Sequence, residues 1–310
     1  MSDRPPRRPT APDGFVVVDK PQGWTSHDVV ARMRRLAGTR KVGHAGTLDP
    51  MATGVLVVGV GRATRLLTYV TGADKDYEAT IRLGRTTTTE DAEGEPLEAR
   101  DASGVTREAL DAAVAGLTGD LLQVPSAVSA IKVDGQRAYA RVRAGEAVEL
   151  AARPVTVSRF EVDAPRAADV DGPPVLDVDA RVTVSSGTYV RALARDLGDA
   201  LGVGGHLTAL RRTRVGGYGL ELARTLDELA DTPDDVPLTV LGLADAARAT
   251  FPVRELTDDE ARALAYGQRL TAAGDEPEAP TAALAPDGRL VGLVERRGRW
   301  VVPTLVLAPA

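Results

Sequence analysis

The distribution of apolar and polar side chains predicts four strands before residue 185. Residues 14–20, GFVVVDK, form a short apolar run that ends in a turn, and residues 54–61, GVLVVGVG, predict a buried strand. Residues 77–84, YEATIRLG, and residues 175–184, VLDVDARVTV, alternate apolar and polar side chains. Because a period of two is typical of a strand with one buried face, both segments predict half-buried strands.

Apolar side chains at helical spacing predict three helices. Ser26 is the expected N-cap of the first, which ends near Gly38; the second begins at Thr106, and the third covers residues 188–202. Residues 84–96, GRTTTTEDAEGEP, predict a polar loop. Since strands and helices alternate without a regular strand-helix-strand rhythm, the sequence predicts an α+β fold.

The pattern changes after about residue 243. An Asp287-Gly288 turn and an Arg297-Gly298 turn separate short apolar runs, which predicts a small, mostly β domain over residues 251–310. We expect a larger domain over residues 14–245, with residues 124–154 forming an excursion from it. Residues 1–13 are basic and Pro-rich and predict a disordered tail.

Composition excludes several classes of protein. The chain has 310 residues and no cysteine, so disulfides, Cys-ligated zinc and thiol catalysis are excluded. The three histidines match no metal-ligand spacing, and we expect no metal site. The N-terminus has no apolar core of a signal peptide, and no apolar run reaches about 18 residues. We therefore expect a cytoplasmic protein without a membrane span.

The charge is unevenly distributed. The net charge is −6, which argues against general affinity for nucleic acid. Nevertheless, residues 29–48 contain five basic side chains and no acidic one, and residues 206–218, HLTALRRTRVGGY, contain three arginines and no acid. Because a polyanion responds to the local field, these segments predict one basic face.

Asp49 is the single acidic residue between Val29 and Val60. It lies in RKVGHAGTLDPMATG, where several glycines permit unusual backbone angles and Pro50 stiffens the bend. Two interpretations remain open. The carboxylate is either an ordinary turn or helix cap, or a nucleophile or base on a rigid loop beside a cationic surface.

Other candidate residues follow Asp49 in the chain. Arg191 and Arg195 are four residues apart on one predicted helix, where like charges repel unless an acid or a phosphate pairs with them. Asp199, Asp49 and a phosphate are all possible partners. Tyr77 and Tyr189 stand at the edges of predicted elements, as core aromatics or as platforms for stacking a base.

Six segments resemble the TruB family of bacterial tRNA pseudouridine-55 synthases. They are DKPQGWTSHDVV, KVGHAGTLDPMATGVLVVGVGRATR, DKDYEATIRLGRTTTTEDAEGE, VPSAVSAIKVDGQRAYARVRAGEAVE, SSGTYVRALARDLG and GGHLTALRRTRVG. They occur in order between about residues 14 and 217. The resemblance implies a pseudouridine synthase catalytic fold, with a mixed, largely antiparallel sheet flanked by helices. It also implies a PUA-like RNA-binding domain at the C-terminus, and a thumb over residues 124–154.

The resemblance also implies roles for individual residues. Asp49 matches the catalytic aspartate, Arg191 the arginine that pairs with it, and Tyr77 the tyrosine that stacks on the flipped base. The other expected substrate contacts are His44, Tyr189 and Leu210. Basic side chains in or near the motifs are expected to contact the RNA backbone: Arg40, Lys41, Lys132, Arg211 and Arg212.

The implied reaction converts uridine 55 in the T arm of tRNA to pseudouridine by base flipping and rearrangement of the glycosidic bond. It needs no cofactor, and the expected partner is the T stem-loop of tRNA, bound by a monomer. Asp49 has three possible roles: attack on C1′, attack on C6, or removal of a proton from C2′. A non-catalytic tRNA-folding protein and a carbohydrate hydrolase remain as alternatives. The hydrolase would need a second positioned carboxylate, and none neighbours Asp49 in sequence.

Overall fold

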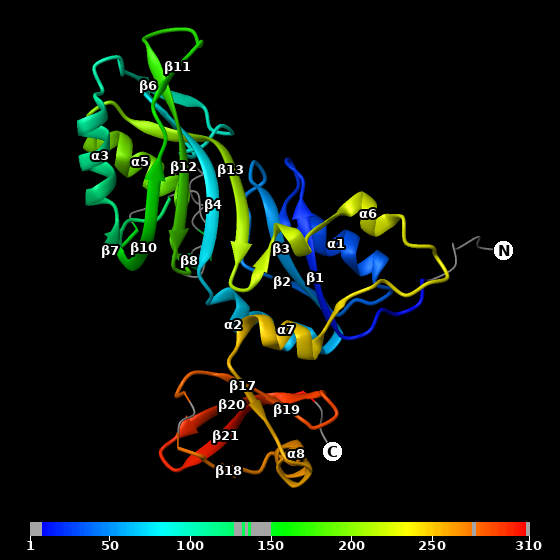
Figure 1. Ribbon diagram of the computed structural model, residues 1–310. Helices are drawn as coiled ribbons and strands as arrows, with labels where there is room; N and C mark the ends of the chain where they lie inside the picture. The colour runs from blue at the N-terminus through cyan, green and yellow to red at the C-terminus, as the bar shows by residue number, and fades with distance from the viewer. Residues whose placement is uncertain (1–7, 127–131, 134–135, 138–149, 275–276, 308–310) are drawn as a thin grey trace, which may run out of the picture.

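The computed structural model describes residues 8–126, 132–133, 136–137, 150–274 and 277–307. A large sheet with helices forms the upper body in Figure 1, and a small β-rich unit lies below it. The helices are α1 (Ser26–Leu36), α2 (Leu67–Thr71), α3 (Arg107–Gly116), α5 (Val190–Ala200), α6 (Leu226–Ala230), α7 (Leu243–Thr250) and α8 (Asp258–Ala265), with short 3-10 helices η1 (Gly61–Arg65) and η2 (Leu220–Leu222).

Twelve strands of the described residues form one sheet in the upper body. Its main path is β15-β1-β3-β13-β4-β12-β10-β7, and most neighbouring pairs are antiparallel; β1 with β15 and β3 with β13 are parallel. The path strands are β1 (Gly14–Lys20), β3 (Thr53–Val60), β4 (Lys75–Leu83), β7 (Gly119–Gln123), β10 (Arg153–Val162), β12 (Val175–Val184), β13 (Gly205–Val215) and β15 (Arg224–Thr225). Four further strands pair with strands of this path: β2 (Val42–Ala45) with β3, β11 (Arg166–Ala168) with β12, β14 (Tyr218–Gly219) with β13, and β16 (Leu241–Gly242) with β1.

Strands with a continuous apolar sequence and strands with an alternating sequence are buried differently. In β1, Val16 and Val18 face one apolar core while Phe15 and Val17 face another, so the strand is buried on both sides and its sequence is continuously apolar. The β3 strand is likewise buried on both sides. In β4, every second residue from Tyr77 to Leu83 is buried and the residues between them are not, as the alternation predicts.

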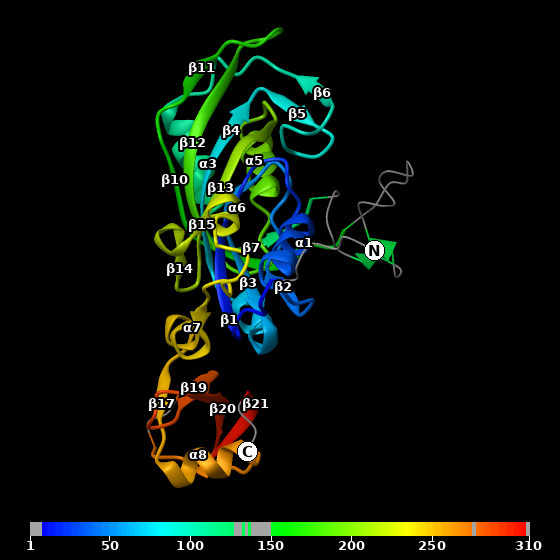
Figure 2. The same cartoon turned by 90° about the vertical axis from the view of Figure 1, so that its right-hand side faces the viewer.

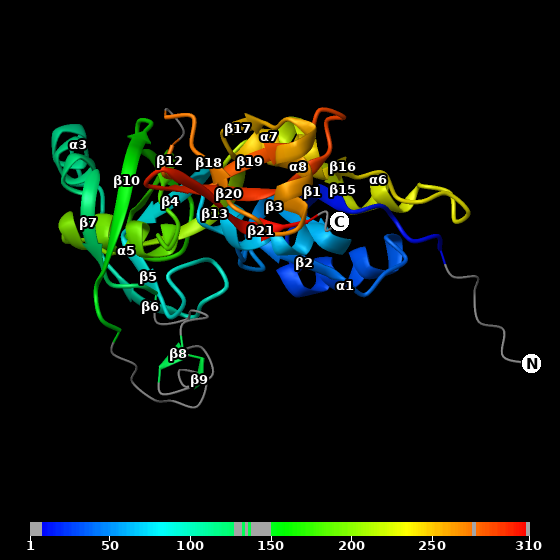
Figure 3. The ribbon, with the colours of Figure 1, turned by 90° about the horizontal axis from the view of Figure 1, so that it is seen from below.

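Three helices cover the face of the sheet toward which Val16 and Val18 point. Apolar side chains of α1, α3 and α5 join the apolar core on this face, which includes Val29, Leu110 and Leu193. Figures 2 and 3 show the two-stranded sheet of β8 (Lys132–Val133) and β9 (Gln136–Arg137) standing off the sheet on the side of α1. Most of the expected excursion, residues 127–131, 134–135 and 138–149, lies outside the described residues.

The C-terminal unit has a five-stranded sheet with helix α8 beside it. Its strands are β17 (Val253–Glu255), β18 (Leu270–Thr271), β19 (Thr281–Leu284), β20 (Leu290–Arg297) and β21 (Trp300–Val306), in the order β17-β19-β20-β21-β18. The Asp287-Gly288 and Arg297-Gly298 turns fall between consecutive strands as predicted; Gly288 has φ 80° and Gly298 φ 62°. The expected α+β fold with a β-rich C-terminal unit is therefore confirmed.

The two bodies share a hydrophobic core. Phe15 and Val57 of the large sheet belong to the same apolar cluster as Leu284 and Leu305 of the small unit. Two arginines of η1 reinforce the junction. Arg62 donates to the carbonyl of Leu307 at 2.9 Å, and Arg65 donates to that of Val306 at 2.7 Å. The C-terminal unit is thus packed against the large sheet and η1.

Three sequence expectations differ from the structure. Residues 8–13 of the expected disordered tail are packed: Ala11 is buried and its N–H donates to the carbonyl of Ala37. The N-cap of α1 is Thr25, which forms a capping box with Asp28, one residue before the expected Ser26. The expected polar loop contains β5 (Arg85–Thr87) and ends at the first residue of β6 (Pro96–Ala99), which pairs antiparallel with β5.

Candidate active site

Asp49 lies in the loop between β2 and β3, and this loop is held along its length. The hydroxyl of Ser26 accepts from the N–H of Leu48 at 2.9 Å and donates to the carbonyl of Leu48 at 3.1 Å. The carbonyl of Pro50 accepts from the N–H of Gly23 at 2.8 Å and from Nζ of Lys20 at 3.3 Å. Because so many peptide groups are paired, the loop presents Asp49 in a defined position.

The carboxylate of Asp49 pairs with Arg191, in the first turn of α5. Nε of Arg191 donates to Oδ2 of Asp49 at 2.9 Å. The arginine side chain is 5 % exposed and the aspartate side chain 36 % exposed, so solvent reaches the carboxylate while the guanidinium is buried. Among the described residues Asp49 caps no helix, which excludes the ordinary helix-cap interpretation there. The sequence left Asp199, Asp49 and a phosphate as possible partners of Arg191 and Arg195. In the structure Asp49 binds Arg191.

Arg191 is held by further contacts. Its Nη1 donates to the carbonyl of Thr89 and to Oγ of Ser126, each at 2.9 Å. Oδ2 of Asp91 lies 3.6 Å from Nε of Arg191, and Asp91 is 3 % exposed. A buried cation with several fixed acceptors has little freedom, so Arg191 holds Asp49 from a rigid base.

The sequence analysis missed Asp91. Its backbone forms a bridge with Leu207 of β13, and its carboxylate accepts from Oγ1 of Thr89 and from the N–H of Glu93. The run of acids EDAEGE in an otherwise polar segment was the available signal. Glu93 is part of the same acidic group: burial raises its pKa, and so do the charges of Asp91 and Asp49.

Arg195, one turn after Arg191, has partners of its own. Nη1 donates to Oε1 of Glu90 at 2.7 Å, Nε donates to Oδ1 of Asp196 at 2.9 Å, and Nη2 donates to the carbonyl of Val124. Asp199, which the sequence offered as a partner, does not pair with it. The two arginines avoid mutual repulsion because each meets different acids.

Two of the expected substrate contacts, Tyr77 and Leu210, lie on adjacent strands. Each is 8 % exposed. Tyr77 of β4 is paired in register with Arg212 of β13, and Leu210 of β13 with Ala79 of β4. Directly opposite residues in a sheet point the same way, so the side chains of Tyr77 and Arg212 share one face.

Of the other two expected contacts, Tyr189 lies at the start of α5, and His44 lies on β2 of the same sheet. Tyr189 is the N-cap of α5, and Gln123 binds both its N–H and its carbonyl. His44 of β2 packs edge-on against His27, with ring centroids 5.8 Å apart. Burial lowers the pKa of His44, and the charges of His27 and Arg212 lower it further.

The five expected RNA-backbone contacts fall into different environments. Arg40 and Lys41 are exposed, after α1. Lys132 lies in β8, where the structure does not describe side-chain surroundings. Arg211 pairs with Asp19 at 2.7 Å. Arg212 is 0 % exposed, so the prediction that it contacts a phosphate is wrong: its side chain lies inside the protein.

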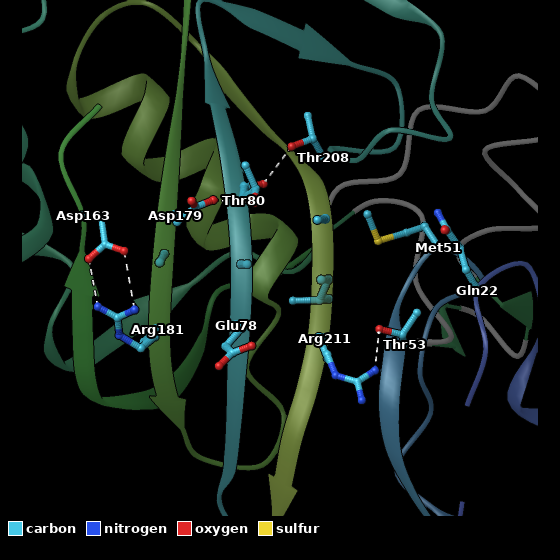
Figure 4. Close-up of a pocket in the computed structure, with 14 residues that line it drawn as sticks. Gln22, Met51, Thr53, Glu78, Thr80, Asp163, Asp179, Arg181, Thr208 and Arg211 are labelled. Carbon is cyan, nitrogen blue, oxygen red and sulfur yellow. Dashed lines mark hydrogen bonds and ion pairs between the residues drawn. The ribbon is translucent and has the colours of Figure 1, made fainter. Parts of the chain in front are cut away.

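A broad cavity of about 660 Å³ lies along β12, β4 and β13 and reaches the segment that follows Asp49 (Figure 4). Its polar lining includes Glu78, Asp179 and Arg211, and the ion pair of Asp163 with Arg181 stands at one side. Met51, Thr53 and Leu210 contribute to the lining, but Asp49, Tyr77 and Arg191 do not. The cavity therefore borders the loop that carries Asp49 without including the Asp49–Arg191 pair.

The described residues contain no cluster of three or more His, Cys, Asp or Glu side chains placed to hold a metal ion. In the same part of the chain, no helix combines the length and the apolar character needed to cross a membrane.

Family models match most of the chain. The TruB family pseudouridylate synthase N-terminal domain matches residues 34–190, the tRNA pseudouridylate synthase B C-terminal domain matches residues 191–236, and the tRNA pseudouridine synthase II C-terminal model matches residues 251–308. Curated relatives named tRNA pseudouridine synthase B are similar over nearly the whole length. The Arthrobacter sp. FB24 protein is 62 % identical over 304 residues, covering 96 % of this chain and 97 % of its own. The Thermobifida fusca protein is 60 % identical over 296 residues, covering 96 % and 99 %.

Solved structures show the same fold. An archaeal box H/ACA sRNP Nop10-Cbf5 complex includes a chain 28 % identical to this one, with a TM-score of 0.68 and coverage of 96 % of this chain and 86 % of that chain. A Cbf5-Nop10-Gar1 complex includes one that is 27 % identical, with a TM-score of 0.69 and coverage of 96 % and 85 %. With a family model matching half of its length and relatives that are 60–62 % identical, the chain belongs to the TruB family of tRNA pseudouridine synthases.

Proposed function

We propose that this enzyme converts uridine 55 in the T arm of tRNA to pseudouridine, with Asp49 as the catalytic carboxylate. One observation carries the assignment. Asp49 is a partly exposed carboxylate on a braced loop, and it is paired with a buried arginine that is itself fixed by Thr89, Ser126 and Asp91. A fixed, bonded guanidinium orients the carboxylate while one side of it stays open to a substrate.

The reaction is a rearrangement. The bond between N1 of uracil and C1′ breaks, the base turns within the site, and C5 bonds to C1′. C5 loses a proton and N1 gains one, so the product is an isomer of the substrate and no electrons are supplied or removed. The proposed enzyme accordingly needs no cofactor. Attack on C1′, attack on C6 and removal of a proton from C2′ all require an ionised, positioned carboxylate.

The uridine must leave its stack before it can react. Flipping a base costs a few kcal/mol, and stacking on an aromatic ring recovers about 1–3 kcal/mol. We propose Tyr77 as that ring, because its strand partner Arg212 reaches the Asp49 loop from the same face of the sheet. His44, Tyr189 and Leu210 are the proposed further contacts.

Basic groups on two parts of the molecule are proposed to bind RNA phosphates. Arg34, Arg35, Arg40 and Lys41 are exposed at the end of α1 and after it. In the C-terminal unit, the guanidinium of Arg269 lies 3.9 Å from the ring centroid of Trp300. Phosphate contacts fix the orientation of RNA without reading its sequence. We propose that the enzyme acts as a monomer in the cytoplasm.

Asp91 is not the second reactive carboxylate that the hydrolase alternative needs. At 3 % exposure this second carboxylate does not reach a substrate, and it supports Arg191 instead. The assay is release of tritium from C5-labelled uridine in a T-arm RNA. An isomerase releases tritium and leaves the base attached, a hydrolase releases free uracil, and a folding factor does neither. Absence of tritium release would reject the proposal. So would full release from a control RNA in which cytidine replaces uridine 55 and the label is on its other uridines, because the reaction would then occur at another position.

A further inference from the structure

Arg212 is a fully buried arginine whose guanidinium binds backbone carbonyls. Nε donates to the carbonyl of Val55 at 2.7 Å, Nη2 to that of Gly46 at 3.1 Å, and Nη1 to that of Thr47 at 3.4 Å. Among the described residues it forms no ion pair with a carboxylate. Burying a cation is costly unless fixed dipoles replace its water shell. These three carbonyls are therefore the groups that make its burial possible.

The three acceptors belong to the segment that carries Asp49. Gly46 and Thr47 precede Asp49 in the loop, and Val55 follows it in β3. A single side chain thus bonds the segment on both sides of the carboxylate. The remaining fixed peptide groups, those of Leu48 and Pro50, are held from the other direction by Ser26, Gly23 and Lys20.

Both glycines that bound this segment abut Arg212. Gly46 has φ 80°, and a Cβ there would lie 3.6 Å from Nη1 of Arg212. Gly54 has φ 99° and pairs with Arg212 in the parallel β3–β13 register. A Cβ on Gly54 would lie 2.1 Å from the carbonyl oxygen of Arg212, so only glycine fits. Gly54 thus fits against the backbone of Arg212, while a Cβ on Gly46 would be in ordinary contact with the Arg212 guanidinium and with Cε of Lys75.

We propose that Arg212 is a positioning residue for catalysis: it sets the backbone of residues 46–55 and thereby the place of the Asp49 carboxylate opposite Arg191. The proposal rests on the catalytic role assigned to Asp49 above. It replaces the role of phosphate contact that sequence position indicated for this arginine. Because a misplacement of about 1 Å can cost about 100-fold in rate, the effect of losing Arg212 falls on turnover.

The neighbouring Arg211 provides the contrast. Its side chain is 36 % exposed, pairs with Asp19 and lines the broad cavity of Figure 4. It touches the Asp49 segment only at its C-terminal part, where Nη1 donates to Oγ1 of Thr53 at 3.3 Å, and among the described residues it binds no backbone carbonyl of that segment. If the arginine pair served to bind phosphate, Arg211→Met and Arg212→Met would both raise KM for tRNA and lower the slope of log K against log salt. If Arg212 positions the loop, its loss lowers kcat and leaves KM and the salt slope of tRNA binding unchanged.

The test is steady-state and single-turnover kinetics of full-length Arg212→Met, Arg212→Lys and Arg211→Met on T-arm RNA. We expect kcat of Arg212→Met to fall by about 100-fold with KM within about threefold. Lysine keeps the charge but lacks the planar fork that reaches three carbonyls, so Arg212→Lys is expected to recover only part of the loss. An unchanged kcat in Arg212→Met, or a loss confined to KM, would overturn the proposal.

General loss of stability needs a separate control. Leu56→Ala removes a fully buried side chain of β3 and is expected to lower Tm without moving the loop. The two variants are compared at the same folded fraction. The proposal requires that Leu56→Ala keeps its kcat while Arg212→Met loses most of it. Equal losses of kcat would mean that Arg212 is only a core residue. If Arg212→Met does not fold, the same comparison is made with Arg212→Lys.

Two structural readouts do not depend on activity. Hydrogen exchange of residues 46–55 is expected to quicken in the Arg212 variants, whereas Arg211→Met, which loses only the side-chain contact with Thr53, should leave residues 46–52 slow. NMR titration is expected to show a higher pKa for His44 in Arg212→Met, since the Arg212 charge helps to lower it together with burial and His27. His206, whose pKa is lowered by burial and by Arg82 and Arg85, is the internal reference.

These readouts separate the two proposals. If Asp49→Asn remains active, the proposed function fails, and Arg212 is still judged by exchange in residues 46–55. If Asp49→Asn is inactive and the Arg212 variants show neither faster exchange nor lower kcat, the function stands and the positioning role is rejected.

Discussion

Arg191 and Asp49 are 142 residues apart in the chain, and their side chains meet with Nε of the arginine 2.9 Å from Oδ2 of the aspartate. The arginine is buried and the aspartate is partly open to solvent. In this arrangement the cation is fixed by the protein and the anion remains available. A carboxylate in that situation is oriented without being enclosed.

Asp49→Asn is expected to abolish pseudouridine formation. Asparagine keeps the shape of the side chain but carries no negative charge, so a catalytic role predicts a loss of at least about 1000-fold in single-turnover rate. RNA affinity should stay within a fewfold because Asp49 adds no attraction for phosphate. Tritium release and filter binding on the same RNA measure the two quantities. Residual turnover that is easily measured would reject the assignment.

Arg191→Lys is expected to restore only part of the activity lost in Arg191→Ala. Lysine supplies charge but cannot contact Asp49, Thr89 and Ser126 together, since it lacks the planar fork of arginine. Single-turnover rates of both variants at saturating RNA are the measurement. Equal activity of Arg191→Lys and the unmodified protein would show that charge alone suffices. Arg181→Met, which breaks an exposed pair with Asp163 away from the loop, is the control.

Removing residues 251–310 is expected to destabilise the catalytic body. The C-terminal unit covers Phe15, Val57 and other residues of a shared core, and Arg62 and Arg65 bond to its last carbonyls. The motifs alone predict that chemistry survives this deletion, because they end before Tyr218. The packing predicts a lower Tm and exposed apolar surface, measured by calorimetry and dye binding. A truncated protein with unchanged Tm would contradict this expectation.

A substitution on α8, away from that junction, tests the specificity of the effect. Arg262 pairs with Asp259, and both side chains are largely exposed. Exposed pairs of this kind contribute about 0–1 kcal/mol, so Arg262→Met should leave Tm nearly unchanged.

Acid stability is expected to depend on Arg214. Its guanidinium bonds to Asp74 and Asp76 at the start of β4. Hydrogen bonds from Arg214 lower the pKa of Asp74, and the same arginine lowers the pKa of Asp76 against the opposing effect of burial. A carboxyl group with a lowered folded pKa stabilises the fold above its unfolded pKa, near 3.9, and loses that contribution as pH falls through its folded value.

Arg214→Met should therefore lower Tm at pH 7 and flatten its fall below about pH 4, because the two carboxylates lose their partner. Thermal melts from pH 7 to pH 2.5 measure this, with Arg262→Met as the reference. Parallel Tm curves for Arg214→Met and the unmodified protein would mean that the pair adds nothing to folding.

Local elements of this protein were predictable because their causes are local. The alternation in residues 77–84 produced the half-buried strand β4, and the apolar stripe of residues 188–202 produced α5. Asp49 stood out as a lone acid among basic residues in a glycine-bounded bend. The sequence of that loop, however, does not decide whether Asp49 is an ordinary turn residue or a catalytic residue. The partner that decides it belongs to a helix from a distant part of the chain.

The sequence by itself determined four strands and three helices of the larger body, the β-rich character of the C-terminal unit, the position of Asp49 and the family to which the chain belongs. Only the tertiary structure decided what surrounds Asp49. It brought Asp91 to Arg191 through a bridge to β13, and it separated Arg211 from Arg212. Adjacent residues on a strand point to opposite faces, but which face is covered depends on what packs against the sheet. For this reason the two neighbouring arginines differ: Arg211 is partly exposed and pairs with Asp19, whereas Arg212 is buried and binds the loop that carries Asp49.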